Sequence, residues 1–113
     1  MDTVYKVYEN DIGIAFQWKK GATLTQVIFR DTGFHLSLQE IEIFINKVKL
    51  SRSNSSCADC HFNRNCRSML LQTPLQKVSI AVSMDELDKI EDLLRGIVFQ
   101  LQLTKYLDSI CKN

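Results

Sequence analysis

The chain has 113 residues, of which 45% are apolar and 24% are charged, and its formal net charge is +1. This length and composition predict one globular domain with a core of its own. A net charge so close to zero argues against a protein that binds nucleic acid through a strongly basic surface. No apolar run approaches the ~18 residues of a membrane span, and the opening MDTVYKVYEND lacks the apolar stretch of a signal peptide. We therefore expect a cytoplasmic protein without a membrane segment, in which the cysteines are reduced.

The first third of the chain, residues 1–36, has the pattern of an antiparallel β-meander. Apolar side chains alternate with polar ones, or β-branched and aromatic residues predominate, over short segments that are joined by short connections. Gly21 ends one turn signal, because glycine takes positive φ without steric cost, and 30–33 forms another. The expected strands are 4–8, 12–18, 23–29 and 34–36.

An amphipathic helix is predicted over 37–50, and a polar, cysteine-bearing loop over 51–68. Ser37 and Glu40 have the form of a capping box, in which each side chain accepts a hydrogen bond from the backbone N–H of the other residue. The apolar residues that follow recur at the spacing of one helix face: Ile41, Phe44, Ile45 and Val48.

The second half of the chain repeats this scheme. Strands are predicted over 69–82, and a C-terminal helix over 83–111 begins at a second capping box, Ser83 with Glu86. When the chain is shifted by 46 residues, the two strand-to-helix junctions align. A weak internal duplication and the common requirements of any strand-to-helix junction explain this alignment equally well. The predicted fold class is α+β, in which an antiparallel sheet from the first third and the strand near 78–82 carries two helices on one face.

The back half of the C-terminal helix has apolar residues on two faces. One stripe runs from Leu87 to Leu101, and a second stripe points the opposite way with the 4, 3, 4 spacing of a coiled-coil seam: Phe99, Leu103, Tyr106 and Ile110. Three interpretations stay open. Both faces are buried within one domain, the helix breaks near 102–104, or the second stripe is a seam for a homodimer. An unbroken helix would be about 40 Å long and would extend beyond a domain of this size.

Three of the four cysteines lie within ten residues, as Cys57-x2-Cys60-x5-Cys66, with His61 next to the second. A C-x2-C pair can place two thiolates on one zinc ion, and Cys66 can supply a third. His61 is the first choice for the fourth ligand, with Cys111 and then His35 as alternatives. A surface loop with reduced thiols is the competing interpretation. The match to the C-x-x-C-H motif of haem attachment and the three-cysteine match to an iron–sulfur site are weaker.

Two other activities remain alternatives to an interaction module with structural zinc. Cys57, Cys60 and Cys66 would serve a thiol-redox or metal-sensing protein. The loop is also basic, with Arg52, Arg64 and Arg67, which would suit a weak nucleic-acid binder. No phosphate-binding glycine motif and no nucleophile motif is present, so no catalytic residue is assigned and an enzyme is disfavoured.

The segments FHLSLQE at 34–40, MLLQTP at 69–74 and VSIAVSMDEL at 78–87 together resemble a family of short uncharacterised proteins from Bacteroidetes. The resemblance implies a shared fold and carries no activity. We expect a small non-enzymatic protein that acts as an interaction or scaffold module.

Overall fold

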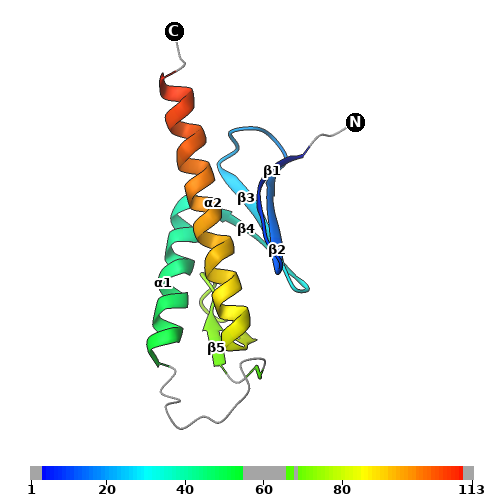
Figure 1. The fold of residues 1–113 in the computed structure, drawn as a ribbon, viewed down its shortest axis with the longest axis vertical. Helices are drawn as coiled ribbons and strands as arrows, with labels where there is room; N and C mark the ends of the chain where they lie inside the picture. Colours follow the sequence, from blue (N-terminus) through cyan, green and yellow to red (C-terminus); the bar gives the residue numbers. More distant parts are fainter. Residues whose placement is uncertain (1–3, 55–65, 68, 111–113) are drawn as a thin grey trace.

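A computed structural model describes residues 4–54, 66–67 and 69–110 of the chain. It has the predicted α+β class, with two antiparallel sheets and two helices (Figure 1). The elements in chain order are β1 (Tyr5–Glu9), β2 (Gly13–Gln17), β3 (Leu24–Phe29), β4 (Thr32–Ser37), α1 (Leu38–Asn54), β5 (Met69–Gln72), β6 (Ser79–Val82) and α2 (Met84–Ile110).

The first four strands form a meander in the order β1-β2-β3-β4, as the sequence predicts. Gly21 takes a φ of 77° between β2 and β3, which confirms the predicted turn. The two helices lie side by side on one side of this sheet (Figure 1). α1 packs against β4, and α2 packs against β1 and β2. The residues that bury their side chains between the sheet and the helices include Val27, Phe29, Phe34, Leu36, Ile41, Phe44, Val48, Leu87, Ile90, Leu94 and Ile97.

The prediction that the strand near 78–82 joins the meander is wrong. β6 pairs antiparallel with β5, and the two strands form a sheet of their own. The connection between them closes tightly, because the Thr73 backbone N–H donates to the carbonyl of Val78 at 3.1 Å and the Thr73 hydroxyl donates to the same oxygen at 2.8 Å. Pairing with the nearest strand along the chain closes a short loop, which costs less entropy than reaching back to the meander.

Both predicted capping boxes are present. The Ser37 amide donates to Glu40 Oε1 at 2.9 Å, and the Glu40 amide donates to Ser37 Oγ at 3.2 Å. The Ser83 and Glu86 pair makes the same two bonds at 3.0 Å each. These bonds satisfy backbone N–H groups that the first turn of a helix leaves without an intrahelical acceptor.

α1 continues to Asn54, four residues beyond the predicted end of the helix. The added residues are polar, but two of them find partners on other elements. The Ser51 hydroxyl donates to the carbonyl of Leu70 at 2.8 Å, and the Arg52 guanidinium pairs with two carboxylates on α2. Tertiary contacts therefore extend the helix past the point at which its apolar pattern stops.

α2 is continuous, so the predicted alternative of a break near 102–104 is wrong. No glycine or proline lies between Gly96 and the end of the helix, and nothing there interrupts the backbone hydrogen bonds. The expected overhang is confirmed, because every residue from Gln102 to Ile110 is exposed. Within the described part of the chain, no helix is long and apolar enough to cross a membrane.

Candidate interaction surface

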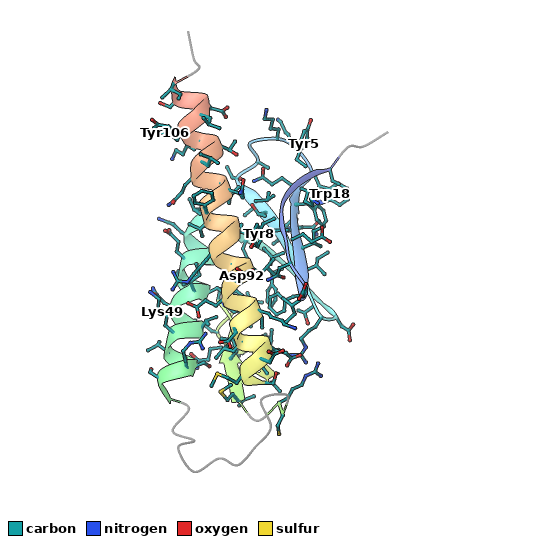
Figure 2. All side chains as sticks on the ribbon, in the orientation of Figure 1. Tyr5, Tyr8, Trp18, Lys49, Asp92 and Tyr106 are labelled. Atoms are coloured by element: carbon teal, nitrogen blue, oxygen red, sulfur yellow. The ribbon has the colours of Figure 1, made fainter. Side chains whose placement is uncertain are left out.

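The stripe that the sequence singled out on α2 lies on the outward face of the helix. Phe99 is 61% exposed, Leu103 38%, Tyr106 62% and Ile110 57%. The expectation that both apolar faces of this helix are buried within one domain is therefore wrong. Figure 2 shows Tyr106 on the end of α2 that projects past the sheet. We call these four residues the α2 seam.

The seam is exposed because its residues alternate around the helix with those of the core stripe. Ile97 is fully buried, whereas Phe99, two residues later and 200° around the helix, faces the opposite side. Beyond Leu101 the helix has also passed the first residue of α1, Leu38, so that no neighbouring helix covers it (Figure 1). The result is a row of large apolar side chains with no cover among the described residues.

The acidic start of α2 faces the basic residues that flank the cysteine loop. Arg52 Nη1 lies 2.6 Å from Asp88 Oδ1, and its Nη2 lies 2.5 Å from Glu91 Oε1. Glu91 also accepts from Arg95 Nε at 2.8 Å. Burial raises the pKa of Glu91, but the hydrogen bonds from Arg95 and Arg52 outweigh it and hold that pKa below its ordinary value.

A second ion-pair cluster is centred on Glu86. Arg67 reaches both of its carboxylate oxygens, with Nη2 to Oε2 at 2.8 Å and Nε to Oε1 at 3.0 Å, and Arg30 Nε lies 3.7 Å from Oε2. Two of the three arginines of the basic loop, Arg52 and Arg67, thus pair with α2. Their charges are partly neutralised inside the chain, which leaves less for the predicted weak binding of nucleic acid.

Most of the predicted zinc ligands lie outside the described residues, namely Cys57, Cys60, His61 and Cys111. Cys66 is described, and its thiol is free and exposed. His35 lies on β4 with its side chain exposed. Within residues 4–54, 66–67 and 69–110, no group of three or more His, Cys, Asp or Glu side chains is arranged to hold a metal ion. The zinc site stays a prediction from cysteine spacing.

The outer face of the meander is a surface that the sequence prediction missed. Trp18 is 56% exposed and Ile28 36%, and both lie on the face away from the helices. The Trp18 ring meets Phe16 edge-on at 5.4 Å between centroids, and its Nε1 donates to Gln26 Oε1 at 2.6 Å. The available signal was the segment 12–18, in which apolar residues occupy both faces of the strand.

No protein-family model matches the chain, and neither a curated protein nor a solved structure shows significant similarity to it. The resemblance to short Bacteroidetes proteins therefore stays a prediction.

Proposed function

We propose that this protein is a small non-enzymatic interaction module that works as a homodimer through the α2 seam. The observation that carries the proposal is the exposure of four large apolar side chains on a helix end that projects from the domain. An apolar row of this kind on a folded surface usually marks a site of contact with another macromolecule.

A second copy of the chain is the partner that the seam fits best. In an antiparallel, two-fold arrangement Phe99 meets Ile110 of the other copy, and Leu103 meets Tyr106, so that the stripe is complementary to itself. The charged residues on the same face, Asp92 and Arg95, precede the seam and stay outside the overlap. A parallel arrangement would instead bring the two Arg95 side chains, which are 51% exposed, against each other.

The area of the seam places it below the standard size of a protein–protein interface. The exposed parts of its side chains, with neighbouring Leu107, amount to roughly 500 Å² on each copy, against about 800 Å² for a standard interface. The seam is therefore of the size of weak, transient interfaces, and we expect a dimer that dissociates on dilution.

Sedimentation velocity over a concentration series tests the proposal. We expect the wild type to pass from monomer to dimer, and a Leu103→Gln, Tyr106→Gln double variant to stay monomeric. The matched control is Ile43→Gln with Leu50→Gln, because these residues of α1 are 47% and 55% exposed but lie outside the seam. A wild type that is monomeric at millimolar concentration, or a control that is equally dissociated, would remove the proposed dimer.

Structural zinc in the cysteine loop remains part of the proposal. Its support is the C-x2-C-x5-C spacing, which offers thiolates from Cys57, Cys60 and Cys66, with His61 or Cys111 as the fourth ligand. The exposed, unbridged thiol of Cys66 is chemically available for such a site. Metal analysis of protein purified without chelator tests this part directly, and a metal-free preparation would leave the loop without a zinc role.

A further inference from the structure

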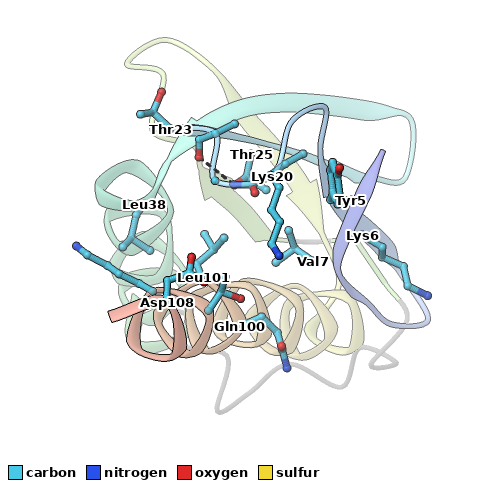
Figure 3. Close-up of a pocket in the computed structure, with 15 residues that line it drawn as sticks. Tyr5, Lys6, Val7, Lys20, Thr23, Thr25, Leu38, Gln100, Leu101 and Asp108 are labelled. Atoms are coloured by element: carbon cyan, nitrogen blue, oxygen red, sulfur yellow. Dashed lines mark hydrogen bonds between the residues drawn. The ribbon is translucent and has the colours of Figure 1, made fainter. Parts of the chain in front are cut away.

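A cavity of about 650 Å³ lies where α2 leaves the end of the meander (Figure 3). Its walls come from β1, the β2–β3 connection, the first residue of α1 and the face of α2 opposite the seam. This volume is within the range of sites that hold small molecules. Neither the core packing nor the proposed dimer uses this space.

The cavity has buried polar groups on its sheet side. Gln17 is 7% exposed and Thr25 1%. Gln17 Nε2 donates to the carbonyl of Ala22 at 3.0 Å and to Thr25 Oγ1 at 3.2 Å, so both amide protons are used. Gln17 Oε1 accepts no hydrogen bond from any described residue. No fully enclosed polar side-chain atom in the described part of the chain lacks a partner, so this oxygen is not fully enclosed. This oxygen is therefore an acceptor still open to the cavity.

Apolar side chains form the adjoining wall. Val7 on β1 and Leu101 on α2 face each other across the cavity, with Leu38 beside them (Figure 3). A ligand that touches all three must have an apolar body, because a fully hydrated molecule would lose its water against them without replacement.

One cationic side chain, that of Lys20, reaches into the cavity. Three lysines line it, Lys6, Lys20 and Lys105, against one acid, Asp108. Lys6 points away and pairs with Glu9 at 3.2 Å. Lys20 extends from the β2–β3 connection across the cavity towards α2 (Figure 3). Neither Lys20 nor Lys105 makes an ion pair with a described residue.

We infer that this cavity binds a small organic anion with an apolar body. The anionic group lies at Lys20, the body lies against Val7 and Leu101, and a hydroxyl or amide donor on the ligand can reach Gln17. Carboxylates and phosphate monoesters share this chemistry, since an ammonium pairs with either.

Isothermal calorimetry with three ligands of equal chain length tests the inference, at concentrations below micelle formation. We expect decanoate and decyl phosphate to bind with one site per chain, and decyltrimethylammonium not to bind. The tighter of the two anions identifies the preferred headgroup. Equal binding of the cation, or no saturable binding of either anion, would overturn the inference.

Variants then locate the site. Lys20→Gln should weaken anion binding about tenfold, the usual effect of losing one hydrogen bond to a charged group. Asp108→Asn should tighten it about threefold, because a nearby like charge is removed. Thr104→Trp, an exposed position on the cavity side of α2, should fill the mouth and abolish binding.

Two controls separate the cavity from the other surfaces. Lys49→Gln removes an exposed lysine of α1 and should leave the affinity unchanged. The Leu103→Gln, Tyr106→Gln variant removes the seam on the opposite face of α2 and should still bind the anion. Loss of binding in either control would place the anion elsewhere and overturn the assignment, whether or not the dimer forms.

Discussion

Gly96 on α2 lies against the Tyr8 ring of β1, with no room for a side chain. A Cβ atom added there would lie 2.4 Å from Tyr8 Cε2, 2.5 Å from Cζ and 2.6 Å from Cδ2. These distances are about 1 Å shorter than ordinary carbon contacts. The ring cannot easily move aside, because its hydroxyl donates to Asp92 Oδ2 at 3.1 Å.

Gly96→Ala changes the free energy of unfolding through two effects of opposite sign. Alanine is the better helix former by about 1 kcal/mol. Overpacking costs about 1–3 kcal/mol, and the overlap with an aromatic ring here favours the upper end of that range. We therefore expect Gly96→Ala to lower the free energy of unfolding by about 2 kcal/mol. Urea denaturation followed by circular dichroism at 222 nm measures this change.

The Tyr8→Ala background gives the decisive comparison. Once the ring is removed, the three nearest contacts of the added methyl group are gone, and Gly96→Ala should raise the free energy of unfolding by about 1 kcal/mol. The effect of one substitution thus changes sign with the residue on β1. If Gly96→Ala stabilises the protein equally in both backgrounds, the close packing of α2 on β1 is refuted.

Three further predictions concern stability and metal content. Ser83→Ala removes the N-cap of α2 and should lower the free energy of unfolding by about 1 kcal/mol in urea. Arg52→Met should cost about 1 kcal/mol at pH 7. Because the folded-state pKa of Glu91 is depressed below its ordinary 4.5, its ion pair with Arg52 stabilises the fold above this pH. The difference in the free energy of unfolding between variant and wild type should therefore shrink as the pH falls below 4.5. If Arg52→Met lowers the free energy of unfolding equally at pH 7 and at acidic pH, the ion pair is contradicted. Cys57→Ser with Cys60→Ser should remove zinc from the purified protein, and retained zinc would exclude these ligands.

The features that could be predicted from the sequence are those that depend on residues close together in the chain. The Ser83 and Glu86 capping box needs only three residues of spacing, and both of its bonds form. The Gly21 turn needs one residue that tolerates positive φ. The meander follows because each strand pairs with the next one along the chain.

The features that could not be predicted depend on distant partners. An apolar strand such as β6 suits either the edge of the meander or a hairpin, and its local pattern does not distinguish them. The last turn of α1 looks polar until Ser51 and Arg52 are placed beside β5 and α2. The cavity was missed for the same reason, since its polar Gln17 and cationic Lys105 lie 88 positions apart in the chain.

The projecting end of α2 connects the two proposals. From Gln102 onward the helix has no buried residue, and a helical segment this short is only marginally stable in water by itself. A second copy on the seam and a ligand in the cavity, which Thr104, Lys105 and Asp108 line, would both bind this end in its helical form, on opposite faces. Each would then reduce the ordering cost that the other must overcome, and the coupling would be reciprocal. The dissociation constant for decanoate should therefore decrease as the protein concentration rises through the range of dimer formation. A constant value in that range, with both binding events intact, would show that the helix end is already ordered in the free monomer.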